Sequence, residues 1–420
     1  MNTVTNPQNS GASARSSGRW HLSRTAAFFL MASITVSFLA GSIAPTPLYA
    51  IYQSQWGFSA LTVSVIFGIY AIAVLLALLV TGRLSDHVGR RPVLLAALLG
   101  QIPVMALFAF AHSVGDLVLA RVIQGLITGF AMGAIGAGML DIDRERGATA
   151  NAVAPGFGTA SGALLAGFLV QYLPAPTHLV YGVMATVYAL QATGVWFMPE
   201  TVSPQGGALR SLAPKFAIPA KARSPLLLAL PVIVASWALS GFYASLGPML
   251  VKSLAGSGSP LLGGLTLFLL TASGGSAVLL LQRRPPLFMM LLGASLLSTG
   301  VTTDLAAAEL HSIGLFLAGT VVAGMGFGTG FQGAVRTVVQ FAAPHERSGL
   351  VSVVFIAAYV AMGVPSVIAG AWVAHHGDIT GTSEHFGAAV IALALLVIVM
   401  RSIRHIVKRK QPHSGCPSAA

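Results

Sequence analysis

Cysteine and charge are what this sequence has least of. It contains one cysteine, Cys416, and only 8% of its 420 residues are charged, whereas 55% are hydrophobic. A single cysteine excludes an internal disulfide and a cysteine-based metal site. A soluble domain of this length could not keep so much apolar surface away from water. The composition therefore predicts an integral membrane protein.

Acidic residues are also scarce, which leaves a large positive balance. There are 23 Lys and Arg against 11 Asp and Glu, so the formal net charge is +12. Apart from Arg121, Lys252 and Arg336, the bases lie in segments that share one side of the membrane if the N-terminus is cytoplasmic. This is the positive-inside distribution. It predicts contact with anionic lipid headgroups and argues against nucleic-acid binding.

The motifs of an enzyme are missing too. The glycines between Gly324 and Gly330 lack the preceding strand and the lysine of a phosphate-binding loop. His375 and His376 have no acidic neighbours at a metal-ligand spacing, and no convincing nucleophile and base form a pair. We therefore expect no catalytic residue, no metal, no cofactor and no enzyme activity.

What the sequence does contain is twelve apolar runs long enough to cross a bilayer. Backbone polar groups in hydrocarbon must be satisfied within their own segment, so each run is predicted to be a helix and the fold class is an all-α membrane protein. An even number of spans places both termini on one face, predicted to be cytoplasmic. The runs cover about 25–50, 59–81, 92–111, 115–140, 150–172, 177–198, 225–250, 260–281, 286–304, 312–340, 348–374 and 384–402.

A polar, proline-rich stretch divides the runs into two sets of six. It covers residues 199–224, and its prolines lie among basic residues, as in a linker. The predicted organisation is a polar cytoplasmic tail, an N-terminal six-helix half, a cytoplasmic linker, a C-terminal six-helix half and a basic cytoplasmic tail. These segments are 1–24, 25–198, 199–224, 225–402 and 403–420.

The two halves resemble each other in sequence at nearly one offset. The matching pairs are Pro45 with Pro248, Gly125 with Gly326, Gly129 with Gly330, and Glu145-Arg146 with Glu346-Arg347. Parallel repeats of six helices place a substrate site at the midplane between the halves.

The most specific stretch connects the second and third runs. Residues 82–92 read GRLSDHVGRRP, in which two glycines permit abrupt turns and one acid lies among bases: Gly82, Gly89, Asp86, Arg90 and Arg91. The string resembles the signature loop between helices 2 and 3 of the major facilitator superfamily, roughly G-x-L-x-D-x-x-G-R-R/K-P. The alternative is a solvated turn whose charges only set the topology.

This resemblance implies a twelve-helix secondary transporter that works by alternating access, most like the drug/proton antiporter group. It also implies that Asp86, Arg90 or Arg91, and Asp141 form a charge cluster that latches one conformational state. Asp86 would then dock near Ser348, at the start of the eleventh helix. The segment 199–201, which reads Pro-Glu-Thr, is similar to another common element of the superfamily.

The fourth run carries an arginine far inside apolar sequence. Arg121, Gln124 and Gly125 resemble the R-x-x-Q-G element of helix 4 in the same superfamily, which is associated with proton-coupled exchange. The resemblance implies that Arg121 lines or borders the central cavity. A buried arginine must find a partner or water, so the alternative is a structural arginine bonded to carbonyls of the first helix.

Four residues of the C-terminal half are candidates for lining a substrate cavity. Trp237 and Tyr243 could present aromatic surface to a substrate, and the alternative for either is packing in the core; Gln332 precedes Arg336 on the tenth run. Arg336 could attract an anion, or it could extend to the lipid headgroups.

An acid within the first run, found in several antiporters of the superfamily, is absent here. Residues 25–56 and 225–250 contain neither Asp nor Glu. The acids nearest the core are Asp116, Asp304 and Glu309, all expected near outer helix ends. If protons are coupled, one of these acids, His311 or a water molecule tuned by an arginine must carry them.

Together these features predict a monomeric, multi-pass protein of the inner or plasma membrane. Its partners would be a small-molecule substrate and protons, and it would export small, partly hydrophobic compounds in exchange for protons. The alternative is proton-coupled uptake of an organic anion, with Arg121 and Arg336 as counter-charges. A channel or a non-transporting receptor is a further alternative.

Overall fold

The computed structural model describes residues 22–410 apart from 83, 204, 213–216 and 344–345. Arg83, Cys416 and most of the two predicted tails therefore lie outside the described residues. Within the described part, the chain forms twelve helical spans, as predicted, and no strand. The helices are α1 (Arg24–Ile43), α2 (Tyr49–Trp56), α3 (Ala60–Thr81), α4 (Leu84–Val88), α5 (Arg90–Ala109), α6 (Val114–Ile142), α7 (Arg144–Tyr172), α8 (Pro176–Trp196), α9 (Ala208–Ser211), α10 (Ala220–Ser245), α11 (Gly247–Ala255), α12 (Pro260–Leu281), α13 (Pro286–Glu309), α14 (Ile313–Val339), α15 (Arg347–His376) and α16 (Ile379–Lys410).

Polar side chains begin many of these helices. A serine hydroxyl accepts a hydrogen bond from the backbone amide three residues further on at Ser23, Ser59, Ser113, Ser259 and Ser312. Such N-caps satisfy amides that have no partner within the helix. Asp143 caps α7 in the same way, which explains why that helix begins at Arg144 rather than near 150.

The ninth span is longer than the sequence suggested, and this changes the position of one acid. The apolar run ends at Asp304, but α13 continues through three alanines, strong helix formers, to Glu309. Asp304 therefore lies inside the helix, more than a turn from its end, and not at the boundary where we expected it.

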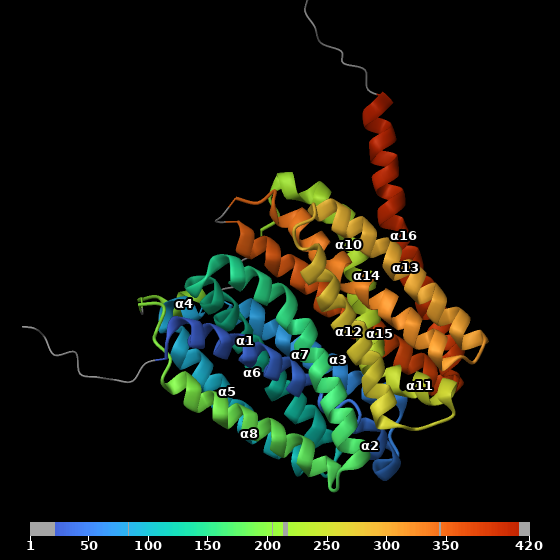
Figure 1. The fold of residues 1–420 in the computed structure, drawn as a ribbon, viewed down its shortest axis with the longest axis horizontal. Helices are drawn as coiled ribbons and strands as arrows, with labels where there is room; N and C mark the ends of the chain where they lie inside the picture. Colours follow the sequence, from blue (N-terminus) through green and yellow to red (C-terminus); the bar gives the residue numbers. More distant parts are fainter. Residues whose placement is uncertain (1–21, 83, 204, 213–216, 344–345, 411–420) are drawn as a thin grey trace, which may run out of the picture.

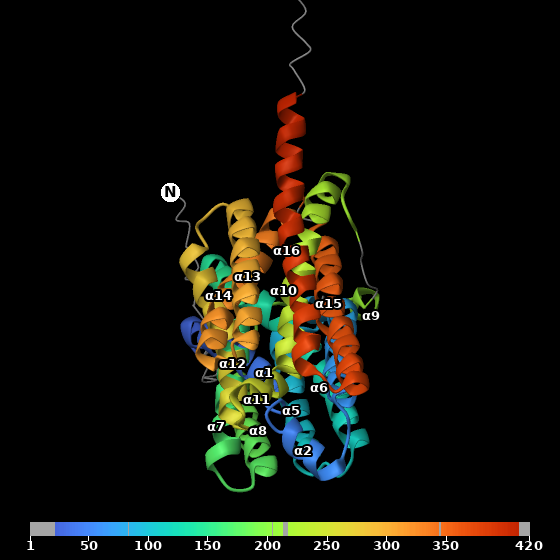
Figure 2. The same cartoon turned by 90° about the vertical axis from the view of Figure 1, so that its right-hand side faces the viewer.

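The first span of each half is broken at the same position of the repeat. α1 stops at Ile43 and α2 begins at Tyr49, with Pro45, which has no amide hydrogen, between them. α10 likewise gives way to α11 just before Pro248. Both views show α2 and α11 at one end of the molecule (Figures 1 and 2). We call this end the α2–α11 end.

The two halves meet along two helix pairs, α3 with α15 and α7 with α12. On α3 the contacts lie in the part nearer the α2–α11 end, where Gly68 faces Gly363 and Ser64 faces Gly370. Residues 40–49 are also all buried. The bundle is therefore packed shut at the α2–α11 end.

Glycine makes these contacts possible. A Cβ added at Gly264 of α12 would lie 2.3 Å from the carbonyl oxygen of Ala163 on α7. Within the N-terminal half, a Cβ at Gly125 would lie 2.7 Å from the Cβ of Ala73 on α3. Small residues let membrane helices approach this closely, so the glycines singled out in the sequence serve helix packing.

Candidate functional site

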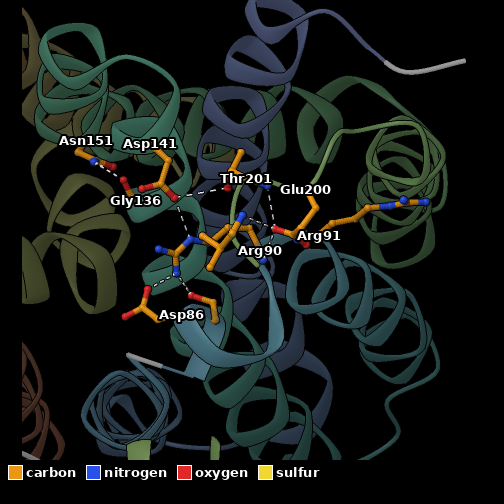
Figure 3. Close-up of polar contacts among 10 residues, drawn as sticks. Asp86, Arg90, Arg91, Gly136, Asp141, Asn151, Glu200 and Thr201 are labelled. Carbon is orange, nitrogen blue, oxygen red and sulfur yellow. Dashed lines mark hydrogen bonds and ion pairs between the residues drawn. The ribbon is translucent and has the colours of Figure 1, made fainter. Parts of the chain in front are cut away.

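Arg90 is the centre of a charge cluster at the end of the bundle opposite to α2 and α11. We call this end the basic face, because α5, α7 and α15 begin there with arginines. Arg90 is 5% exposed. Its Nη1 lies 2.5 Å from Asp86 Oδ1 and donates to the Ser85 hydroxyl, and its Nε donates to Asp141 Oδ2 at 3.2 Å (Figure 3). One guanidinium thus joins α4, α5 and α6.

Glu200 completes this cluster from a distant part of the sequence. Its Oε1 accepts the backbone amide of Arg90 at 2.8 Å and its Oε2 accepts that of Arg91 at 3.1 Å (Figure 3). A carboxylate at a helix N-terminus satisfies free amides and faces the positive end of the helix dipole. The neighbouring Thr201 hydroxyl reaches Asp141 Oδ2 at 3.4 Å. In the sequence, the Pro-Glu-Thr segment marks Glu200 only through its likeness to a superfamily element. That likeness does not identify the amides of Arg90 and Arg91 as the partners of Glu200.

Gly89 is required where the loop turns into α5. Its φ is +106°, a conformation that side chains rarely adopt. A Cβ there would also lie 2.6 Å from Glu200 Oε2. Gly82, at the start of the loop, has ordinary helical backbone angles. It is Gly133 that lets α6 come close to the loop, since a Cβ on Gly133 would lie 3.2 Å from the Gly82 carbonyl oxygen.

The structure distinguishes the two arginines that were candidate partners for Asp86. Arg90 pairs with Asp86, whereas Arg91 donates to the carbonyl of Trp196 and lies over its indole ring, 5.7 Å from the centroid. Among the described residues, no hydrogen bond or ion pair joins Asp86 to Ser348 in this conformation, so the docking at α15 stays a prediction.

The linker is attached to this same loop. The amide of Gln205 donates to the carbonyl of His87 at 2.9 Å, and His87 Nδ1 lies 3.2 Å from the carbonyl oxygen of Gly206. Together with the Glu200 contacts, these bonds attach Glu200, Gln205 and Gly206 to the N-terminal half.

Arg121 is fully buried, with 0% exposure, and is held by the first span. Its guanidinium donates to the Tyr49 hydroxyl from Nε at 2.8 Å and from Nη2 at 2.7 Å, and Nη1 donates to the Ser42 carbonyl at 2.6 Å. Nη1 also donates to Gln124 Oε1 at 2.8 Å, while Gln124 Nε2 donates to the Gly41 carbonyl at 3.0 Å. Arg121 and Gln124 therefore hold both sides of the break between α1 and α2.

Aromatic rings and not acids surround this arginine. Its guanidinium carbon lies 5.7 Å from the ring centre of Tyr49, 5.3 Å from that of Tyr70 and 5.6 Å from that of Phe108. No ion pair to Arg121 occurs among the described residues. Cation–π contacts and neutral acceptors stabilise the charge instead. This is the structural alternative raised by the sequence, bonding to carbonyls of the first helix.

In the C-terminal half, Trp237 lies in a group of aromatic rings from three helices. Its ring centre is 5.2 Å from that of Phe331 on α14 and 5.0 Å from that of Tyr359 on α15. All three residues are partly exposed, and the Trp237 Nε1–H is buried without a hydrogen-bond partner among the described residues. Gln332, next to Phe331, is also partly exposed. We call Trp237, Phe331 and Tyr359 the aromatic group.

Arg336 and Tyr243 are engaged elsewhere. Arg336 Nη1 donates to the Gln282 carbonyl at the end of α12, at 2.7 Å. Tyr243 is 3% exposed, and its hydroxyl donates to Asp304 Oδ2 at 2.7 Å. The Tyr243 hydroxyl is thus bonded within the protein, whereas Arg336 is partly exposed, uses only Nη1 in hydrogen bonds and forms no ion pair among the described residues.

Among the described residues, no cluster of three or more His, Cys, Asp or Glu side chains could hold a metal ion. The arrangement is that of a multi-pass helical bundle with two pseudo-equivalent halves, an ion-pair cluster at one end and a closed contact at the other.

Comparison with known proteins gives the family. The model of the Major Facilitator Superfamily matches residues 28–303, and the chain belongs to that superfamily. A crystal structure of a mutant of the nucleoside transporter NupG superimposes with a TM-score of 0.69, covering 90% of this chain and 99% of that chain at 11% sequence identity. Membership of this superfamily indicates a membrane transporter, and the structural match shows the same fold.

Proposed function

We propose that this protein exports small, partly hydrophobic compounds in exchange for protons, by alternating access between its two halves. This proposal rests on the chemical character of the side chains that are available to a substrate. The aromatic group of the C-terminal half is partly exposed, Arg121 is occupied by internal hydrogen bonds, and Arg336 bonds through Nη1 to the Gln282 carbonyl. Aromatic surface suits an apolar, planar compound. Arg121 is not available as the counter-charge of an organic anion, because all three of its guanidinium nitrogens donate to protein acceptors.

The packing supports an alternating-access mechanism. Contacts between α3 and α15 lie near the α2–α11 end, and the chain around both breaks is buried there, at residues 40–49 and 241–247. If the basic face is cytoplasmic, as the positive-inside rule predicts, this conformation is closed to the outside. In the opposite state those contacts would open, and the cluster around Arg90 would act as the latch at the basic face.

A growth-inhibition panel tests the proposal. Cells with and without the overproduced protein would be exposed to dyes, antibiotics and organic acids. We expect added resistance to planar, partly hydrophobic compounds, lost when the proton gradient is collapsed and reduced by Asp86→Asn at equal membrane abundance. Increased sensitivity to a toxic organic acid would contradict export and favour uptake, and resistance that survives collapse of the gradient would contradict proton exchange.

A further inference from the structure

Asp304 is a carboxyl group buried inside the C-terminal half with incomplete hydrogen bonding. It lies on α13 and is 6% exposed. Its Oδ2 accepts from the Tyr243 hydroxyl at 2.7 Å, while its Oδ1 has no hydrogen-bond partner among the described residues. Ionisable groups are expensive within a membrane-spanning bundle and are usually paired, so an incompletely satisfied one points to function.

The carboxyl occupies a space formed by three helices. Tyr243 comes from α10, and its hydroxyl is 3.1 Å from Thr320 Oγ1 on α14. Gly319 makes room, because a Cβ there would lie 2.3 Å from Asp304 Oδ1. The Tyr243 ring stacks on Phe316, with ring centres 6.0 Å apart and planes 5° from parallel. Asp304 therefore lies in a specific polar site between packed helices and not at an exposed helix surface.

No basic group contacts Asp304 among the described residues. On α14 the single charged side chain is Arg336, which bonds to Gln282 at the basic face. On α13 itself the other acid is Glu309, and it is exposed. Among the described side chains of the other neighbouring segments, the charged or titratable groups that are exposed are Lys221, Arg223, Lys252, His311, Glu384 and His385, and the partly exposed Arg401 lies far along α16 from its start at Ile379. A permanent carboxylate here would have no cation to offset its burial.

The three polar groups can accommodate both charge states without moving a heavy atom. With Asp304 ionised, Thr320 donates to Tyr243, and Tyr243 donates to Oδ2. With Oδ2 protonated, the carboxyl donates to the tyrosine oxygen, and the tyrosine hydroxyl turns to donate to Thr320. Hydroxyl groups both donate and accept, so both hydrogen bonds in this row of Asp304, Tyr243 and Thr320 reverse direction when the two hydroxyl hydrogens rotate.

The row of Asp304, Tyr243 and Thr320 also lies beside a segment that moves in the proposed mechanism, the break between α10 and α11. Tyr243 lies just before Leu246, where α10 gives way to α11, and residues 241–247 around this break are all buried. Tyr243 therefore connects Asp304 to the break in the first span of the C-terminal half. A change in charge at Asp304 changes the strength of that connection, since hydrogen bonds to an ionised acceptor are roughly twice as strong as neutral ones.

We propose that Asp304 is a proton-binding site of this transporter, with Tyr243 and Thr320 as its hydrogen-bond partners and the break between α10 and α11 as the element that its protonation controls. This assignment rests on the proposed exchange of substrate for protons. It supplies the proton carrier that the first span of each half lacks.

Infrared difference spectroscopy of the full-length protein in lipid vesicles, between alkaline and acidic buffer, tests the site without a substrate. We expect a carboxylic acid C=O band that grows on acidification, is lost in Asp304→Asn and is retained in Glu309→Gln, which removes an exposed acid on the same helix. In Tyr243→Phe the band should persist at a shifted frequency, because its hydrogen bond is gone.

Two results would overturn the assignment. One is a spectrum of Asp304→Asn identical to that of the parent protein, and the other is an Asp304 band that stays constant between the two buffers. A titrating Asp304 in a protein that gives no proton-dependent resistance would uphold the proton site and contradict the export function. The two proposals can therefore fail separately.

Discussion

Arg121 and Asp304 occupy similar settings in the two halves. Each is a buried ionisable side chain bonded to a tyrosine hydroxyl beside a broken span. Arg121 bonds to Tyr49, the first residue of α2, and Asp304 bonds to Tyr243, near the end of α10. One is permanently positive and the other can gain or lose a charge, so the two breaks are held by different electrostatics.

Replacing Arg121 tests its role as the support of the first break. Arg121→Ala would leave the Ser42 carbonyl, the Tyr49 hydroxyl and Gln124 Oε1 without their donor, at about 1–3 kcal/mol for each buried group left unsatisfied. We expect a lower thermal unfolding temperature in detergent and loss of transport. Lys252→Ala, at an exposed position, is the matched control and should change neither. An Arg121→Ala protein with unchanged melting would show that the guanidinium network contributes nothing to the fold.

At this scale the sequence predicted residue types but not their partners. It identified Arg121 as a buried cation in need of acceptors, and the structure supplies them from the first helix. It grouped Tyr243 with the cavity candidates, whereas the structure buries Tyr243 against Asp304. A hydrogen bond between helices depends on how they pack and rotate, and no local pattern encodes that.

At the scale of elements, glycine allows α13 and α14 to form the tightest helix pair. A Cβ on Gly293 would lie 2.2 Å from the Gly330 amide nitrogen, and one on Gly300 would lie 2.2 Å from that of Ala323. Backbone atoms cannot move aside as a flexible side chain can. This pair positions Asp304 against Thr320, so its spacing bears on the proton-binding site as well as on stability.

Gly293→Ala measures the importance of this spacing. We expect the extra methyl to force the helices apart and destabilise the protein by about 1–3 kcal/mol, the usual range for overpacking, seen as earlier thermal unfolding. Gly182→Ala on α8 is the control, because nothing lies within 4 Å of a Cβ there. Equal melting of the two variants would mean that the contact is looser than the structure shows.

The sequence predicted the elements themselves well, for reasons that are physical. An apolar run long enough to cross the bilayer must form a helix, because its backbone amides and carbonyls need hydrogen-bond partners there. All twelve predicted spans are helices in the structure. Helix ends depend on caps and were less accurate, as at Arg144 and Glu309. Glu200 was noticed only as part of a short motif, because its partners at Arg90 and Arg91 lie far away in sequence.

At the scale of the whole molecule, the contact between α3 and α15 should open during transport. A Cβ on Gly363 would lie 3.8 Å from the Cβ of Ala71, about the 3.8 Å mean separation in disulfides. We expect Ala71→Cys combined with Gly363→Cys, in a Cys416→Ser background, to cross-link on oxidation and to stop transport, with recovery on reduction. Each single cysteine variant is a control. Full transport by the cross-linked protein would contradict alternating access at this interface.

The attachment of the linker to the switch loop limits how far the two halves can separate. Glu200, Gln205 and Gly206 are fastened to the N-terminal half through Arg90, Arg91 and His87, and α9 packs against α4. The chain left to join the halves therefore runs only from Leu212 to Pro219, and fully extended it reaches about 28 Å. This short connection permits the two halves to rotate against each other. It also limits the distance between them when the contact at the α2–α11 end opens.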